Sequence, residues 1–128
     1  MRVMFGAVAL VMMAGTAMAD PLEGRWQTAP DDNGNVGHID VAPCGAALCG
    51  TLVAAFDSTG AQVESENIGR LIIWDTVAAG EGEYEGRIYA PDRDREYASS
   101  LVLAGDRLTV SGCVLGICRE GGTWVRVQ

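Results

Sequence analysis

Two cysteine pairs limit what this chain can fold into. Cys44 and Cys49 form one pair and Cys113 and Cys118 the other, both with C-x4-C spacing and both followed by a strand-like run. A four-residue connection between antiparallel strands places its flanking residues about 4.5–5.5 Å apart at Cα, a separation that suits a disulfide. Of the three pairings that four cysteines allow, the spacing therefore favours Cys44–Cys49 and Cys113–Cys118.

Zinc binding and thiol redox chemistry are the alternatives to disulfides. Structural zinc sites usually have C-x2-C spacing and thiol oxidoreductases use C-x-x-C, whereas both pairs here are C-x4-C. Short secreted chains with an even number of cysteines use them as bridges. We therefore predict no metal and no cofactor. Each bridge closes a small ring, so it contributes only about 2 kcal/mol of stability.

The first 19 residues have the pattern of a secretory signal peptide. Arg2 precedes an apolar run of about a dozen residues, and Ala17-Met18-Ala19 ends this run before Asp20. The run is too short to span ~30 Å of hydrocarbon, which takes about 20 apolar residues. We predict cleavage after Ala19, a periplasmic or secreted protein, and no membrane span.

Residues 20–128 are predicted to form a single domain, large enough to have a core. Loss of Arg2 with the signal peptide changes the formal charge from −8 to −9, and all nine basic residues of the full chain are arginines. Nucleic-acid phosphates require a basic face, so we predict no nucleic-acid partner. The same acidity disfavours adsorption to anionic lipid.

Short strand-like segments separated by turn signals occupy most of the chain. We expect eight strands, at 22–28, 36–41, 51–56, 70–75, 83–89, 95–103, 107–112 and 123–127. Residues 57–69 are expected to form a long loop with room for one helical turn, and 76–82 a second loop. Asn33-Gly34 is a strong hairpin signal. Eight strands in sequence order favour an antiparallel up-and-down barrel, which leaves no exposed sheet edge.

Several different sequence motifs are spread over nearly all of residues 20–128. They are G-x-W at 24–26, V-x-P-C-G-x-x-L-C-G at 41–50, G-x-I-Y-x-P at 86–91, and G-C-x-L-G-x-C-R at 112–119 followed by T-W-x-R-V at 123–127. Together they resemble the small secreted bacterial proteins of domain of unknown function 2147. The resemblance implies a lipocalin-like (calycin) eight-stranded barrel of the cell envelope or medium. It implies no established activity.

The resemblance also implies a role for two residues. In lipocalins the Trp of the G-x-W motif closes one barrel end and packs against an Arg from the last strand region. The matching residues are Trp26 and Arg126, and a guanidinium over an indole contributes ~0.5–2 kcal/mol. The chain departs from its relatives in the turn before Tyr97, where they tend to have a Gly and this chain has Asp94-Arg95.

Candidate functional side chains are few. His38 is the one histidine; it alternates with Asp40, so we predict an exposed strand residue and not a catalytic base. With no catalytic constellation, the chain is predicted not to be an enzyme. The interior of an eight-stranded barrel is either filled or holds one small ligand. For the second case, Trp74, Tyr89 and Tyr97 are the candidate ligand-binding residues.

Alternation assigns further residues to shared strand faces. Period two puts Tyr97, Leu101 and Leu103 on one face of their strand, and Leu71 and Ile73 on one face of theirs. The pattern leaves open which face points inward.

Two functions from different classes fit this sequence. The first is a periplasmic or secreted lipocalin-like protein that binds a small apolar ligand at the barrel mouth. The second is a solid-core envelope module that docks a protein or glycan partner through its loops, chiefly residues 57–69.

Overall fold

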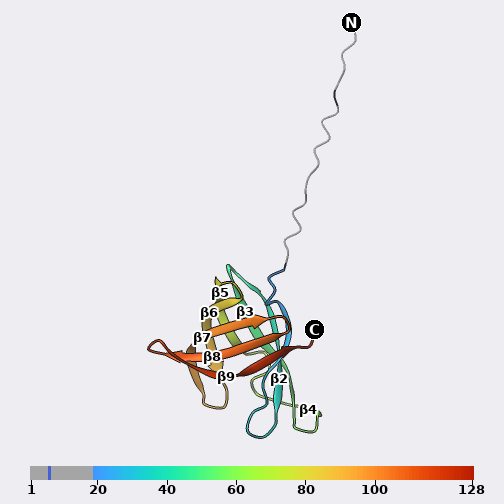
Figure 1. Ribbon diagram of the computed structural model, residues 1–128. Coiled ribbons are helices and arrows are strands. Elements are labelled where there is room, and N and C mark those ends of the chain that lie inside the picture. Colours follow the sequence, from blue (N-terminus) through green and yellow to red (C-terminus); the bar gives the residue numbers. More distant parts are fainter. Residues whose placement is uncertain (1–5, 7–18) are drawn as a thin grey trace.

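The computed structural model describes residues 6 and 19–128 (Figure 1). Apart from residues 6 and 19, the predicted signal peptide lies outside the described residues. The described part contains strands and no helix. The strands are β1 (Gly24–Gln27), β2 (Val36–Cys44), β3 (Ala47–Phe56), β4 (Gln62–Val63), β5 (Leu71–Gly80), β6 (Glu83–Ala90), β7 (Arg95–Ala104), β8 (Arg107–Val114) and β9 (Ile117–Arg126).

Eight of these strands close into one antiparallel barrel. The order around the sheet is β2-β1-β9-β8-β7-β6-β5-β3, and β2 pairs with β3 to complete the circle. β4 is a two-residue strand that is added to the outer end of this order by pairing with β3. The predicted eight-stranded up-and-down barrel is therefore confirmed.

The barrel has two different ends. The terminal end holds both Asp20 and Gln128, where Arg25 N donates to Gln128 O over 2.8 Å. The opposite, loop end carries the connections 28–35 and 57–70. In Figure 1 the described chain enters at the top of the barrel and the C-terminus leaves at its right side.

Large side chains fill the barrel interior. Among the described residues, the largest fully buried side chains are those of Trp26, Leu22, Ile39, Ile73, Leu101, Leu108 and Thr76. A Cβ on Gly50 would lie 2.7 Å from Ile73 Cγ1 and 2.8 Å from Ile39 Cγ2, because these two isoleucines meet over the glycine. The interior is thus a packed core, which is one of the two outcomes open to a small eight-stranded barrel.

Some strands run further than the sequence predicted. β5 continues to Gly80, which pairs with Glu83 of β6, so the loop predicted for 76–82 is a tight hairpin. The signal was hidden because a β-bulge interrupts the alternation near Asp75, whose φ is 50°. The 57–69 loop contains β4 and hydrogen-bonded turns in place of a helical turn.

Both cysteine pairs form the predicted disulfides, with Cα separations of 5.5 Å and 4.0 Å. The strands run through the cysteines, so each connection has two residues instead of the expected four. Cys113 and Cys118 are direct cross-strand partners, whereas Cys44 and Cys49 are joined diagonally. We call residues 42–49 the first clasped hairpin and residues 112–119 the second clasped hairpin.

Candidate functional site

The three aromatic residues predicted to bind a ligand do not lie together. Tyr97 shares the inner face of β7 with the fully buried Leu101. Trp74 is the cross-strand partner of Arg87, and Tyr89 follows Arg87 by two residues on the same face. This is the outer face of the wall. The structure therefore brings Trp74 and Tyr89 together on the outer face and leaves Tyr97 inside, although Tyr89 is buried beneath Arg70 and only Trp74 is partly exposed.

Trp74 and Tyr89 help to line a depression of about 250 Å³ on this outer face, which we call the outer depression. Its lining residues are Arg70, Leu71, Trp74, Tyr89 and Glu96. The guanidinium of Arg70 lies over the Tyr89 ring, with Cζ 3.5 Å from the ring centroid. This cation–π contact covers the tyrosine. The depression can offer an aromatic edge at Trp74 and a cation at Arg70 to a small molecule.

The turn after β6 is tied to the outer depression. The hydroxyl of Tyr89 donates to Asp94 Oδ1 over 2.7 Å. This hydrogen bond, and then burial, raise the pKa of Tyr89, so the phenol remains a donor at neutral pH. Asp94 has a φ of 48°, in the left-handed region that Gly and, less readily, Asp adopt. The departure from the family pattern at this turn thus supplies a specific hydrogen bond.

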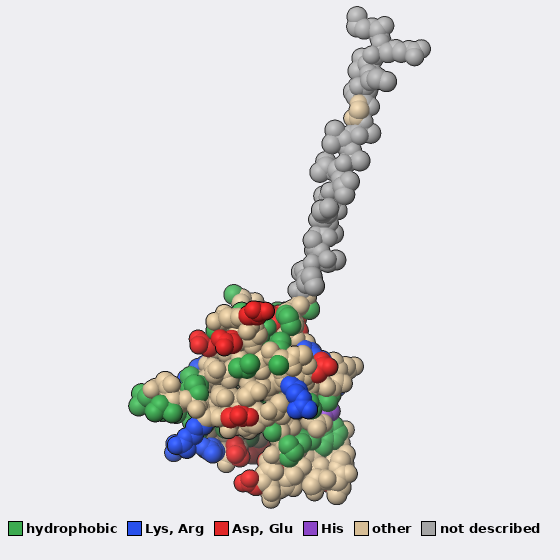
Figure 2. All heavy atoms as spheres, in the orientation of Figure 1, with side chains coloured by type: hydrophobic (Ala, Val, Ile, Leu, Met, Phe, Trp, Pro, Cys, Tyr) green, Lys and Arg blue, Asp and Glu red, His purple; other side chains and the backbone are tan. Residues whose placement is uncertain are grey.

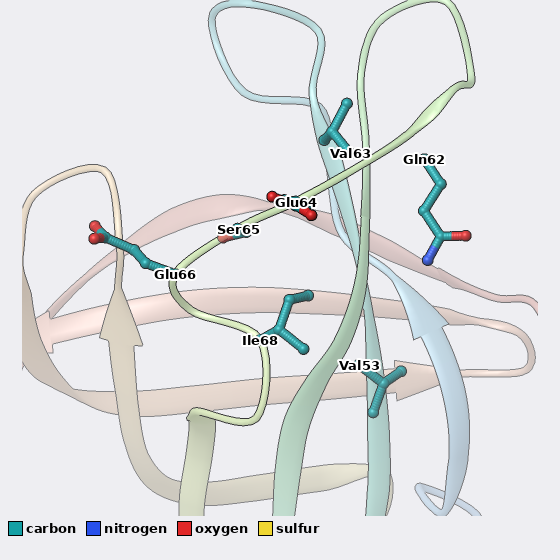
Figure 3. A pocket seen from close by; sticks show the side chains of 7 residues that line it. All are labelled: Val53, Gln62, Val63, Glu64, Ser65, Glu66 and Ile68. Carbon is teal, nitrogen blue, oxygen red and sulfur yellow. The ribbon is translucent and has the colours of Figure 1, made fainter.

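The 57–69 loop borders a wide groove of about 570 Å³. The groove is lined by Val53, Gln62, Val63, Glu64, Ser65, Glu66 and Ile68. Figure 3 shows segment 62–68 crossing over β3, with the carboxylate of Glu66 directed away from that strand. Val63 and Ile68 are both exposed. The groove is therefore an open surface with a mixed apolar and acidic lining.

Asp57 holds the start of this loop in shape. Its Oδ1 accepts hydrogen bonds from Thr59 Oγ1 at 2.6 Å, Thr59 N at 2.9 Å and Ala61 N at 3.1 Å. These bonds lower the pKa of Asp57, with the Thr59 hydroxyl the largest cause. The predicted docking loop is thus an ordered turn closed by its own side chain.

Trp26 and Arg126 lie in contact with each other. They are cross-strand partners of β1 and β9, and Arg126 Cζ lies 4.3 Å from the centroid of the Trp26 ring. Trp26 is fully buried, and its indole N–H donates to Leu22 O over 2.9 Å. Arg126 Nε donates to Asp106 Oδ1 over 3.1 Å. The closing of the barrel by this pair stays a prediction.

His38 is half-buried, not exposed as the alternation suggested. Its Nε2 lies 3.2 Å from Gln27 Oε1, and its ring centroid lies 4.6 Å from that of Phe56. Burial, and then the nearby charge of Arg25, lower the pKa of His38. Asp40 binds Arg25 through two hydrogen bonds of 2.7 Å and 3.0 Å. The histidine therefore belongs to a packed, neutral patch on the outer wall.

The second clasped hairpin presents an apolar tip that sequence reasoning missed. The exposed fractions are 56% for Val114, 98% for Leu115 and 71% for Ile117. In Figure 1 this β8–β9 hairpin projects at the left of the barrel, and Figure 2 shows hydrophobic side chains on its end. Leu115 and Gly116 form the turn with φ values of 51° and 78°. Such a turn normally takes Asn-Gly or Gly-Gly, so a Leu there is a usable signal.

Over residues 19–128 and residue 6, no three or more His, Cys, Asp or Glu side chains are grouped so that they could hold a metal ion. No helix in that part has the length and apolar character needed to cross a bilayer.

The barrel and its register define a lipocalin-like protein, and the comparisons agree. A family model described as "Uncharacterized protein conserved in bacteria (DUF2147)" matches residues 24–126. The chain belongs to this family, as its motifs predicted. It is similar in structure to protein HP1028 of Helicobacter pylori, described as a lipocalin-family member, with a TM-score of 0.65 and 14% identity over 87% of this chain and 85% of that one. At this identity the likeness shows the fold alone. A search of curated proteins found no match.

Proposed function

We propose that this protein is a solid-core lipocalin-like protein of the bacterial envelope that docks a partner protein through the second clasped hairpin. The observation that carries the proposal is Leu115, whose side chain is 98% exposed while its backbone has a φ of 51°. The packed interior supports the solid-core alternative over a ligand held inside the barrel.

The backbone of Leu115 is in a conformation that disfavours a leucine. The left-handed region costs an L-residue other than Gly roughly 1–2 kcal/mol. An exposed side chain gains almost nothing from burial to offset this cost. Conformations of this kind are often kept where they serve a function. We attribute the leucine to a contact made outside the domain.

The hairpin holds the backbone at this position in one conformation. The disulfide between Cys113 and Cys118 joins its two strands, and Val114 and Ile117 pair directly before the two-residue turn. A preorganised backbone loses little conformational entropy on binding. Leu115 and its neighbours are therefore suited to fill an apolar pocket as an anchor.

A protein pocket fits this tip better than a lipid surface. Residues 113–118 contain no charged and no aromatic side chain, while residues 20–128 carry a formal charge of −9 once Arg2 is gone. Interfacial membrane binding depends on buried apolar area and on attraction to anionic lipid, and this tip offers three aliphatic side chains on an acidic protein. The matching partner has an apolar socket, and the exposed Arg119 and Glu120 beside the tip favour a rim with charges of both signs.

Export supports the envelope assignment. Residues 1–19 have the pattern of a signal peptide, and two disulfides are typical of an oxidising compartment. We therefore place the docking event in the periplasm or outside the cell.

The test compares the two hairpin tips in the bacterium that makes the protein. Benzoylphenylalanine replaces Leu115 in one protein and Ala46 in the other, and both cells are irradiated. A discrete protein adduct is expected from position 115 and none from position 46. The adduct should vanish when Val114 and Ile117 are changed to Ser. No adduct from 115, or the same adduct from 46, contradicts docking through the tip, as does flotation of the purified protein with phosphatidylcholine vesicles.

A second candidate function is binding of a small aromatic ligand that carries an anionic group, in the outer depression. The observation that favours it is the half-buried Trp74 beside the Arg70–Tyr89 stack. A planar ligand carrying an anionic group matches this pair of side chains. Titration with the probe 1-anilinonaphthalene-8-sulfonate is expected to enhance its fluorescence in the native protein and much less in Trp74→Ala. Equal enhancement in both proteins contradicts this site.

A further inference from the structure

The segment before β1 is an integral part of the terminal end. Leu22 is fully buried, and its carbonyl accepts the indole N–H of Trp26 over 2.9 Å. Arg126 Nη1 donates to Glu23 O over 2.8 Å, and Nη2 donates to Pro21 O. Ala19, by contrast, is exposed. Within the described segment 19–128, Asp20 is the first residue with a hydrogen bond to the rest of the domain.

Asp20 forms hydrogen bonds through its nitrogen, its carbonyl oxygen and one carboxylate oxygen. Its Oδ1 accepts from the hydroxyl of Tyr84 at 2.6 Å and from Leu22 N at 2.9 Å. Its carbonyl accepts from Glu23 N over 2.9 Å, and its own nitrogen donates to Glu23 Oε2 over 2.6 Å. Burial, and then the bond to Asp20, raise the pKa of Tyr84 to about 12, so the phenol is a stable donor.

We propose that cleavage after Ala19 completes this end of the barrel, because the α-ammonium group that it creates on Asp20 forms an ion pair with the carboxylate of Glu23. The inference rests on the proposed export, but it is independent of docking through the second clasped hairpin. The nitrogen that would carry the charge already lies 2.6 Å from Glu23 Oε2.

The chemistry is a simple hydrolysis. A signal peptidase uses one water molecule to break the Ala19–Asp20 peptide bond; the hydroxyl goes to the carbonyl carbon of Ala19 and a hydrogen to the nitrogen of Asp20. The new amine is protonated below about pH 8. The neutral amide donor is thereby replaced by a cation, and hydrogen bonds between ionised groups are roughly twice as strong as neutral ones. The carboxylate of Asp20, the phenol of Tyr84 and the guanidinium of Arg126 surround this pair.

Four purified proteins test the ion pair. Two begin at Asp20 and two at Ala19, which moves the ammonium by one residue; each start is made with Glu23 and with Glu23→Gln. For a partly exposed pair we expect the Asp20 start to raise the thermal midpoint by about 2–4 °C when Glu23 is present. With Glu23→Gln the difference should fall below about 1 °C, because the glutamine accepts a hydrogen bond but carries no charge.

Two results would overturn the proposal. One is an equal midpoint for the two starts when Glu23 is present, and the other is a difference that Glu23→Gln leaves unchanged. The mass of the exported protein from its own bacterium is a separate check, expected to correspond to a chain that begins at Asp20. A different first residue contradicts the inference even if the hairpin docks a partner.

Discussion

The two clasped hairpins share a cysteine pattern and a two-residue turn, but they are used differently. In the first, Leu48 and Cys49 are 8% and 9% exposed, and Gly45 takes the positive φ of 65° that the turn needs. In the second, Leu115 occupies the corresponding turn position and is almost fully exposed. The same disulfide-closed hairpin therefore contributes buried side chains to the core in one case and presents an exposed apolar tip in the other.

Sheet pairing explains the difference. In the first clasped hairpin, β3 continues into the barrel wall, where Leu48 pairs with Thr76 of β5. In the second, β9 pairs with β1 only at Val125 and Arg126, so residues 117–121 have β8 as their one strand neighbour in the described sheet. The β9 strand of the second hairpin thus projects beyond the sheet, whereas Leu48 and Cys49 of the first hairpin lie against the core.

The largest contrast is expected from truncating one apolar side chain in each hairpin. Leu48→Ala should lower the free energy of unfolding by about 2–5 kcal/mol because it empties a buried position. Ile117→Ala, at a 71% exposed position, should change it by less than about 0.5 kcal/mol. Urea unfolding followed by tryptophan fluorescence measures both. Similar losses for the two variants would show that the second tip is packed within the domain.

Removing the disulfides one at a time sharpens the contrast. Cys44→Ala with Cys49→Ala should cost about 2 kcal/mol from the lost ring closure, and somewhat more because Cys49 is buried. Cys113→Ala with Cys118→Ala should cost no more than about 2 kcal/mol, yet it should weaken the adduct formed from position 115. A larger loss of stability from the second pair would reverse the assignment of roles.

Two glycines, each adjacent to a disulfide-bonded cysteine of one clasped hairpin, probe the same difference in packing. Gly50→Ala should cost about 1–3 kcal/mol, because its Cβ would lie 2.7 Å from Ile73 Cγ1. Gly112→Ala places a Cβ 3.4 Å from Tyr97, near ordinary contact, and should cost less than about 1 kcal/mol. Thermal unfolding monitored by circular dichroism ranks the two. Equal costs would argue against a tightly packed interior beside the first hairpin.

The smallest effect expected is a pH dependence of the free energy of unfolding. It involves β2, the strand that leads into the first clasped hairpin. The hydrogen bond from Arg25 lowers the pKa of Asp40 on β2. A depressed native pKa contributes stability above the ordinary pKa of an Asp, and this stability is lost as pH falls through the native value. Both side chains are more than a third exposed, so the contribution is below about 0.5 kcal/mol. The stability advantage of the native protein over Asp40→Asn should shrink between about pH 5 and pH 2; a constant difference contradicts the assignment.

Much of the fold could be predicted because its contacts are local. Cysteine spacing gave both disulfides, and hairpin-connected strands gave the barrel. Alternation also grouped Tyr97 with Leu101 correctly. It failed for Leu71 and Ile73, which lie in different environments because an irregular pairing with β3 inserts an extra residue between them.

The candidate site was harder to predict. Trp74, Tyr89 and Tyr97 are all aromatic, so residue type alone does not show that two of them face outward and one inward. The direction of each side chain depends on the register between neighbouring strands. The exposed tip could have been predicted from the residues of the turn, because a Leu before Gly116 is unfavourable in a two-residue turn of this type. An apolar residue between two strand runs looks like core until the register is known.

The most direct measurement of the central claim is the free energy of unfolding of Leu115→Asn. Asn followed by Gly116 suits the positive φ values of this turn, and the lost leucine makes almost no contact within the domain. Stability should therefore rise by about 0.5–1 kcal/mol, while Ala46→Asn, at the exposed second position of the first turn, should change it little. A loss of about 1 kcal/mol or more in Leu115→Asn would show that this leucine stabilises its own fold and would contradict a tip kept for a partner.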